Sequence, residues 1–444
     1  MGGALLGLFA GLSVLRVPIG VCLMAASMLS LIIFTNTPLT IASQRIVAGI
    51  MPFPLLAIPL FVLTGAVMNM GGVTRRLLDL AGALVGRATG SLAQTNVLAS
   101  LLFGGLSGSA VADVSSLGRI LIPEMKAKNY RAAYAAAVTA ASAVISPILP
   151  PSITLIVYGV ASGTSIGDLF IAGIGPALLY TAFLMIAVRM TVKKRGYATP
   201  LLSRKGPGAA VASNVAAQPR NDSPNGRLWP AFYQAIPALG LPVLILVGIR
   251  MGYFTPTEAA AVALFYALFC GIVVYREFRL PAFYQSLVSS ARLVGLIMLV
   301  IAAAQLYSYA LTSKRIPQGI AQSVFEITSN PVVLLLILNL LLLIVGMFIE
   351  ANAAIIIMTP ILLPLGAELG IDPVHLGIMV TINLGVGLIT PPVGLCVMLA
   401  GEIAGVSYMQ AIKDTVPFLV AAVVLILSVT FIPEISLWLP NLTQ

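Results

Sequence analysis

Long apolar runs separated by short polar segments make up most of the chain. Two of the longest extend from Val332 to Met347 and from Pro417 to Leu437. Neither run alternates polar and apolar residues, as barrel strands do over segments of about ten residues. A spanning helix instead needs about 20 predominantly apolar residues. The pattern therefore predicts an all-α polytopic membrane protein with about ten spanning helices, the first a short helix over Met1 to Leu15.

Composition points to lipid as the surrounding solvent. Hydrophobic residues fill 59% of the 444 positions and charged residues 9%, and the mean hydropathy is +1.05. A soluble domain carries about 25% charged residues, because water must wet its surface. The cysteines Cys22, Cys270 and Cys396 lie far apart in apolar stretches, which favours packing over a disulfide framework or a zinc site.

Basic residues explain the formal net charge of +10 without a nucleic-acid partner. They gather between apolar segments, at Arg75–Arg76, Lys126–Arg131 and Arg189–Arg227. Such clusters mark cytoplasmic loops. The longest hydrophilic segment, residues 193–228, is also rich in Gly, Pro, Ser and Asn, which predicts a cytoplasmic linker. It divides the chain into residues 1–192 and 229–444.

The two halves carry matching proline patterns. Pro150-Pro151 lies in the first half and Pro391-Pro392 in the second, and upstream of each pair an apolar stretch ends in a proline, Pro123 or Pro360. Aligning these upstream prolines places Asp113 opposite Glu350. The match predicts two inverted repeats, an architecture of many secondary transporters. Each repeat is expected to hold a re-entrant hairpin, over residues 94–124 and 331–364, and then a broken helix, over residues 132–160 and 375–401.

The segment from Gly104 to Asp113 concentrates glycine and serine at expected membrane depth. These residues interrupt a helix and expose carbonyls and hydroxyls, which are the oxygen ligands that coupling ions use in transporters. A small-residue packing face between helices is the alternative. The Pro-Pro pairs remove amide hydrogens and free further carbonyls; Ser146 and Ser152 flank the first pair, and Gly387 and Thr390 precede the second.

Carboxylates inside a membrane are costly and indicate function. Asp113 and Glu350 are expected to hold an ion, to accept hydrogen bonds that fix a hairpin tip, or to pair with a base. Arg119 follows Asp113 by six residues, is expected on nearly the same face of a helix, and is therefore the expected partial partner.

Several motifs together resemble the large membrane subunit of the tripartite ATP-independent periplasmic (TRAP) transporters. They cover nearly the whole chain: Phe53–Phe61 (FPLLAIPLF), Ser107–Asp113 (SGSAVAD), Pro150–Ser152 (PPS), Tyr158–Gly159, Phe254–Ala259 (FTPTEA) and Thr390–Gly394 (TPPVG). The pattern departs at Ser146, where the family commonly has glycine, although a carbonyl ligand survives that change.

The resemblance implies a sodium-driven elevator in the bacterial inner membrane, with a scaffold and a mobile transport domain. It implies small carboxylate substrates, a separate small four-helix membrane subunit, a periplasmic substrate-binding protein, and sodium ions without an organic cofactor. The residues that match the first sodium site are Ser107, Ser109, Ser146, Leu149 and Pro151. Pseudo-symmetry suggests Gly346, Asn352, Gly387, Thr390 and Pro392 for the second. Supporting or substrate-proximal positions are Asp113, Arg119, Ser152 and Glu350.

Other functions remain open at this point. A stand-alone ion-coupled anion symporter has the same architecture and needs no binding protein. An intramembrane serine protease would use Ser107, which lies in a G-x-S-G pattern, but a serine nucleophile needs an activating base. The only histidine, His375, is expected in a loop outside the core. An ATP-driven pump is disfavoured because the sequence has no phosphate-binding loop.

Overall fold

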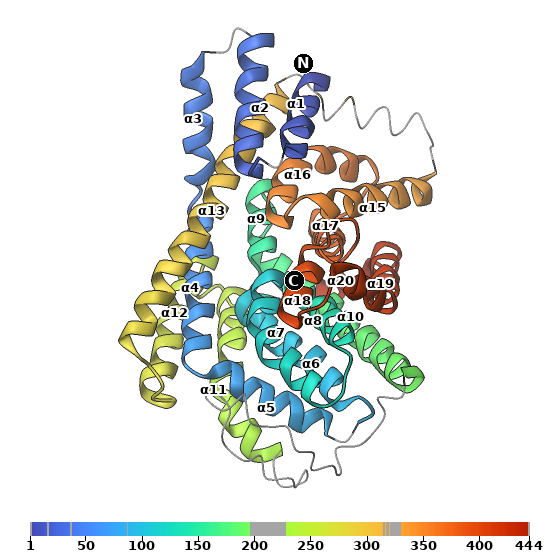
Figure 1. Ribbon diagram of the computed structural model, residues 1–444. Coiled ribbons are helices and arrows are strands. Elements are labelled where there is room, and N and C mark those ends of the chain that lie inside the picture. Colours follow the sequence, from blue (N-terminus) through green and yellow to red (C-terminus); the bar gives the residue numbers. More distant parts are fainter. Residues whose placement is uncertain are drawn as a thin grey trace.

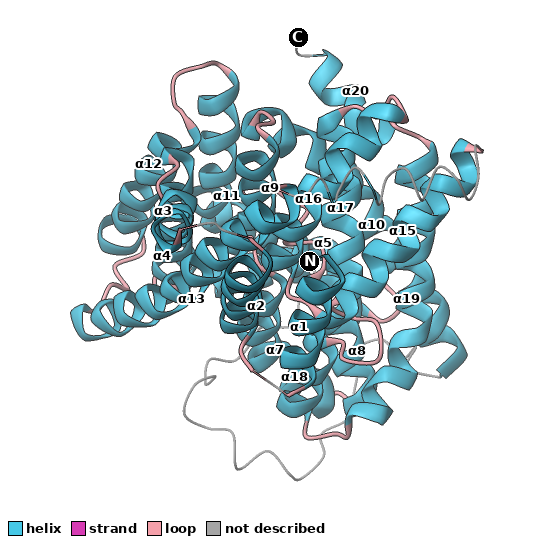
Figure 2. Cartoon of the chain, turned by 90° about the horizontal axis from the view of Figure 1, so that it is seen from above, coloured by secondary structure: helices cyan, strands magenta, loops and turns pink. Residues whose placement is uncertain are grey.

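The computed structural model describes residues 2–442 apart from residues 16, 36–37, 87, 196–227, 314–315, 317–318 and 320–329. Every regular element in this part of the chain is helical (Figures 1 and 2). Eight of the described helices are long and apolar enough to cross a membrane. The expected all-α membrane architecture is therefore confirmed. Most of the predicted linker, residues 193–228, lies outside the described residues.

One group of helices, here called the side bundle, packs around the long helix α13 (Figure 1). In it α13 contacts α2, α3 and α4, and α12 contacts α4. Many of its apolar side chains, such as Phe265 and Leu296, are exposed, as a lipid-facing surface requires. Its members are α1 (Gly2–Val14), α2 (Ile19–Phe34), α3 (Leu39–Ile50), η1 (Phe53–Leu56), α4 (Ala57–Met70), α5 (Val73–Val85), α11 (Leu228–Arg250), α12 (Pro256–Phe269), η2 (Cys270–Val274) and α13 (Leu280–Thr312).

The remaining helices form the central bundle, which draws on both halves of the sequence. The first half contributes α6 (Ser91–Ser107), α7 (Ala110–Ala127), α8 (Ala132–Ala143), α9 (Ile153–Ser162) and α10 (Ile166–Arg195). The second half contributes α15 (Pro331–Phe348), α16 (Ala351–Glu368), α17 (Pro373–Gly387), α18 (Leu395–Ala404), α19 (Tyr408–Phe431) and α20 (Glu434–Leu442).

Within the central bundle, two helix pairs form hairpins and two further pairs are broken helices, each interrupted once. The α6–α7 pair spans residues 91–127 and the α15–α16 pair residues 331–368, slightly more than the predicted 94–124 and 331–364. The α8–α9 and α17–α18 pairs span residues 132–162 and 373–404 and are interrupted at the Pro-Pro pairs, as the missing amide hydrogens predict. Both Pro–Pro peptide bonds are cis.

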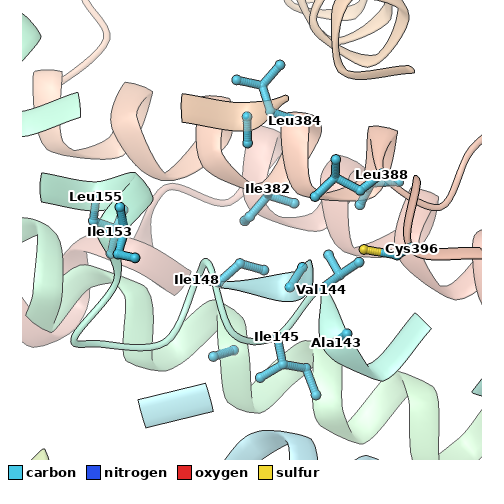
Figure 3. Close-up of a cluster of buried hydrophobic side chains, with 14 of the residues drawn as sticks. Ala143, Val144, Ile145, Ile148, Ile153, Leu155, Ile382, Leu384, Leu388 and Cys396 are labelled. Atoms are coloured by element: carbon cyan, nitrogen blue, oxygen red, sulfur yellow. The ribbon is translucent and has the colours of Figure 1, made fainter. Parts of the chain in front are cut away.

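The two halves make corresponding contacts within the central bundle. Helix α6 packs on α8 as α15 packs on α17, and α7 packs on α18 as α16 packs on α9. The connector between α8 and α9 faces α17 across a buried apolar cluster that includes Val144, Ile148, Ile382 and Leu388 (Figure 3). The orientation of each half relative to a membrane stays a prediction.

Candidate functional site

The first candidate site lies where the α6–α7 turn meets the α8–α9 connector. Asp113, in the first turn of α7, is only 1% exposed. Ser107, the last residue of α6, donates a hydrogen bond of 2.9 Å from its Oγ to Asp113 Oδ1. Ser146 donates from its Oγ to the other carboxylate oxygen, Oδ2. One carboxylate therefore joins the hairpin turn to the broken helix.

Small residues allow this close approach. Gly108 ends α6 with a φ of +59°, a left-handed conformation that favours glycine. A Cβ at Gly108 would lie 2.7 Å from the Pro151 carbonyl oxygen, and a Cβ at Gly104 would lie 3.0 Å from Ser146 Oγ. The turn therefore rests directly on the backbone of the α8–α9 connector.

Several oxygens at this contact accept no hydrogen bond from the described part of the chain. They include the carbonyl oxygens of Ser146, Leu149 and Pro151, and also that of Pro150. The Ser109 side chain, which precedes α7, makes no capping hydrogen bond. Ser152 has a different role, because its Oγ donates to the Pro147 carbonyl at 2.6 Å and accepts from Leu155 N at 3.3 Å. It caps α9 and ties the start of that helix to the connector.

The oxygens gathered here suit a hard cation. They comprise one carboxylate, hydroxyls and main-chain carbonyls, the ligands that oxygen-seeking cations prefer. Among the described residues, no three His, Cys, Asp or Glu side chains lie together as a transition metal would require. The five residues predicted for the first site, Ser107, Ser109, Ser146, Leu149 and Pro151, therefore fall on two segments that touch, with Asp113 between them.

The second hairpin uses its carboxylate differently. Glu350 is the N-cap of α16, and its Oε2 accepts from Asn352 N at 3.0 Å and Ala353 N at 3.3 Å. Its Oε1 accepts from Asn352 Nδ2 at 2.8 Å. Glu350 thus closes the first turn of its own helix. The buried Oδ1 of Asn352 has no hydrogen-bond partner among the described residues, so this side-chain oxygen remains available to a ligand.

The second hairpin meets its broken helix through glycine. A Cβ at Gly387 would fall 2.6 Å from Gly346 Cα, and a Cβ at Gly346 would fall 3.0 Å from Leu384 Cα. Thr390 Oγ1 donates to the Val386 carbonyl at 2.8 Å. The Pro392 carbonyl accepts from the Tyr408 hydroxyl at 2.9 Å. Most predicted residues of this site are therefore engaged within their own segment or in backbone packing.

Arg119 does not pair with Asp113. The ion pairs of the described residues include none between them, and Arg119 is exposed. Six residues correspond to about 1.7 turns of an α-helix, which places the two side chains on different sides of α7. The expectation that they share a face was wrong. Two serine hydroxyls bond to Asp113 instead, which matches the alternative of hydrogen bonds at the hairpin tip.

His375 is neither in a loop nor outside the core. It lies in the first turn of α17, only 3% exposed, and its Nδ1 is 2.7 Å from Ser436 Oγ. Asp372 caps this helix and Pro373 follows at its first position, a helix-start signal that the sequence interpretation overlooked. Ser107 is bonded to Asp113 instead, so the structure does not assemble the serine–histidine pair of a protease.

The sequence analysis did not predict two polar clusters that lie inside the central bundle. Asn96 Nδ2 on α6 donates to Thr139 Oγ1 on α8 at 2.7 Å. In the second half, Asn383 Nδ2 on α17 donates to Asn339 Oδ1 on α15 at 2.7 Å. Each cluster links a hairpin helix to the neighbouring broken helix by side-chain hydrogen bonds. The signal was available, because an asparagine within an apolar helix usually bonds to a neighbouring helix.

Comparison with known proteins assigns the family. Residues 6–435 match the family model described as "Tripartite ATP-independent periplasmic transporter, DctM component". The chain is 38% identical over 443 residues to the sialic acid TRAP transporter large permease protein SiaM of Vibrio cholerae, covering 100% of this chain and 99% of that one. It is 41% identical over 390 residues to the C4-dicarboxylate TRAP transporter large permease protein DctM of Pseudomonas aeruginosa, covering 88% and 86%.

A solved structure supports the fold. The YdaH transporter of Alcanivorax borkumensis superimposes with a TM-score of 0.59 at 17% identity, covering 92% of this chain and 90% of that one. At that identity the likeness concerns the fold alone. The match of the family model over residues 6–435 and the two permease relatives together decide the assignment: this chain belongs to the DctM component family, the large permease subunits of the TRAP transporters.

Proposed function

We propose that this chain couples the inward movement of sodium ions to the transport of small organic acids. The observation that carries the proposal is the carboxylate of Asp113, which accepts hydrogen bonds from the hairpin at Ser107 and from the broken helix at Ser146. Free carbonyls and the Ser109 hydroxyl lie on the same two segments. A sodium ion bound among these oxygens would hold the turn and the connector together.

The ion would thereby shape the substrate site. The α6–α7 turn leads directly into the first amides of α7, and the N-terminus of a helix favours an anion such as a carboxylate. Ordering the turn around sodium would present these amides to the substrate. Each positive charge that moves inward through 100 mV contributes about 2.3 kcal/mol, which supplies the driving force.

Contacts between the bundles support an elevator in which the central bundle moves against the side bundle. A Cβ at Gly65 of α4 would lie 2.9 Å from the Leu106 carbonyl oxygen, and a Cβ at Gly105 would lie 3.3 Å from Pro242 Cγ of α11. The side bundle thus meets the first hairpin turn across a contact lined by glycine and proline. At this point no long side chains interlock, which supports sliding of the hairpin turn past the side bundle.

The relatives support a substrate class and two partners for this chain. The chain is a multi-pass protein of the bacterial inner membrane and a transporter subunit, not an enzyme. The relatives described above are named for sialic acid and C4-dicarboxylates, both carboxylates, which supports small organic acids as substrates here. The tripartite description supports two partners, a small membrane subunit and a periplasmic substrate-binding protein.

Thermal unfolding of the purified chain in sodium and in potassium tests the ion site. A ligand that binds only the folded state stabilises it by RT ln(1 + [L]/Kd), so the transition temperature must rise with sodium concentration. The double variant Ser107→Ala with Ser109→Ala is expected to lose this rise. Ser115→Ala is the matched control, because that hydroxyl lies on α7 and bonds only to the Val111 carbonyl within its own helix. Equal unfolding in both salts would remove sodium coupling from the proposal.

Uptake into proteoliposomes tests the transport step separately. Sialic acid and a C4-dicarboxylate are supplied with the cognate binding protein and small subunit, under an inward sodium gradient. Uptake that needs all three proteins and the gradient is the expected result. Uptake that persists without any binding protein would favour a stand-alone symporter.

A further inference from the structure

A cavity of about 730 Å³ lies between the two bundles, at the start of α10. The side bundle lines it with Pro52, Pro54 and the turn between α11 and α12, and the central bundle lines it with the turn between α9 and α10. In an elevator, one bundle slides past the other. The residues around this cavity therefore lie where the two bundles must part.

An ion pair crosses the boundary between the bundles beside this cavity. Arg250 Nη1, at the end of α11, lies 3.8 Å from Asp168 Oδ1, in the first turn of α10. The preceding residues lie close together as well, because a Cβ at Gly167 would be 3.0 Å from Ile249 Cγ2. The start of α10 thus rests against the end of α11 through one small residue and one pair of opposite charges.

Two other ion pairs differ from this one in place and in length. Arg76 pairs with Glu277 at 2.8 Å within the side bundle, and Arg195 pairs with Asp414 at 2.9 Å within the central bundle. The pair between the bundles is longer, and its Arg and Asp side chains are 30% and 29% exposed. Charges that are this exposed can separate without leaving either one buried and unpaired.

Each charge also suits its own helix. A carboxylate is favourable in the first turn of a helix and a cation in the last turn. Ser165 Oγ accepts a hydrogen bond from Asp168 N at 3.3 Å, which fixes the start of α10. These helix-end roles explain why an acid and a base stand at Asp168 and Arg250, but they do not require the two side chains to meet across the boundary.

We propose that Asp168 and Arg250 form an electrostatic latch that holds the central bundle in the position that the structure shows. The ion pair forms in this position and breaks when the central bundle slides, so its loss raises the population of other positions. The latch rests on the elevator movement of the proposed function and not on sodium coupling. The basic residues Lys193, Lys194 and Arg195 lie at the other end of α10, which predicts that the latch faces the periplasm.

Distances between two spin labels test the latch. Glu434→Cys on α20 carries the label of the central bundle, and Tyr253→Cys, in the turn after α11, carries that of the side bundle. Both native side chains are exposed, whereas the three native cysteines are buried. Double electron–electron resonance of the full chain in nanodiscs gives the population of each distance. Asp168→Asn should raise the ratio of the second distance to the first about threefold, as expected for a partly exposed ion pair.

A double-mutant cycle separates the latch from the helix-end roles. Arg250→Gln should change the ratio as much as Asp168→Asn, and the double variant should change it no further, because either loss breaks the same contact. Glu277→Gln, which breaks the ion pair with Arg76 inside the side bundle, is the matched control and should leave the ratio unchanged. Potassium chloride at about 1 M should bring wild type to the ratio of Asp168→Asn, because salt screens exposed charges.

The outcomes distinguish the latch from the elevator movement itself. Two distances whose ratio is the same in wild type and Asp168→Asn, or effects of the two single variants that add, would overturn the latch alone. A single distance in wild type and all variants, with and without sodium and substrate, would overturn the elevator and the latch together. If Asp168→Asn does not fold, Arg250→Gln and the salt dependence of wild type still decide, because an unchanged ratio in both would overturn the latch.

Discussion

The two hairpins meet their broken helices in different ways, although their sequences align. In the first half, the contact is polar and crosses between segments, because Asp113 accepts from both Ser107 and Ser146. In the second half, Glu350 caps its own helix, and the contact between segments is Gly346 against Gly387. One half joins two elements through a carboxylate, and the other joins them through backbone packing.

A single position captures this difference. The residue four before the Pro-Pro pair is Ser146 in the first half and Gly387 in the second. The serine supplies a hydroxyl that donates to Asp113, whereas the glycine, which has no side chain, allows the backbone at Gly346 to approach closely. A shared backbone plan can therefore hold two sites of different chemistry. The first has a carboxylate that accepts from serine hydroxyls, and the second has Asn352 Oδ1 as an unpartnered buried side-chain oxygen.

The largest effect is expected where backbone meets backbone. Gly387→Ala would press a methyl group onto Gly346, and main chain cannot move aside as a side chain can. We expect a loss of about 3 kcal/mol in the free energy of unfolding, measured by thermal or denaturant unfolding in detergent. Gly385→Ala is the control, because its Cβ would meet only side chains, Val144 Cγ1 at 3.2 Å and Pro147 Cγ at 3.6 Å. Equal stability of the two variants would contradict close packing at Gly387.

Exchange of the two carboxylates for amides should separate their roles. Asp113→Asn keeps the size of the side chain but weakens two charge-assisted hydrogen bonds, each worth about 1.5 kcal/mol or more. The sodium concentration that gives half of the thermal shift should rise about tenfold. Glu350→Gln should cost roughly 1 kcal/mol of stability as a weakened cap and leave the sodium response intact. The comparison fails if Glu350→Gln has the larger effect on sodium.

Two serines beside the first Pro-Pro pair offer a finer test. Ser146→Ala and Ser152→Ala each remove one buried hydroxyl, and each should lower stability by about 1 kcal/mol. Only Ser146 contacts Asp113, whereas Ser152 caps α9. The sodium-dependent shift should therefore weaken in Ser146→Ala alone. Equal weakening in both variants would assign the effect to general loosening of the connector.

The smallest effect is expected at Arg119. Its side chain is exposed and makes no ion pair with Asp113, and substitutions at such surface positions usually change stability by less than about 0.5 kcal/mol. Arg119→Gln should match wild type in thermal unfolding and in its sodium response. A loss of sodium response comparable to that of Asp113→Asn would restore a functional link between the two residues.

Much of the fold was predictable because its signals are local. Each signal acts on the backbone at its own position. Apolar runs of spanning length predict helices, and helix breaks are predicted by the missing amides at Pro150-Pro151 and Pro391-Pro392 and by the glycines near Ser107. The helices, the interruptions and the family followed from these patterns. The hairpin ends differed by only a few residues, because fraying and capping set the last turn.

The partners of each polar side chain were decided by the tertiary structure alone. The sequence placed Asp113 and Glu350 at equivalent positions and offered Arg119 as a base, and it left His375 in a loop. Only the packing of α6 and α7 on the α8–α9 connector brought Ser146 to Asp113. Only the contact of α15 with α17 left no room for a side chain at Gly387. Local patterns fix where a helix stops, because backbone hydrogen bonds are short-range. Which side chain a carboxylate meets depends on how helices distant in sequence pack together.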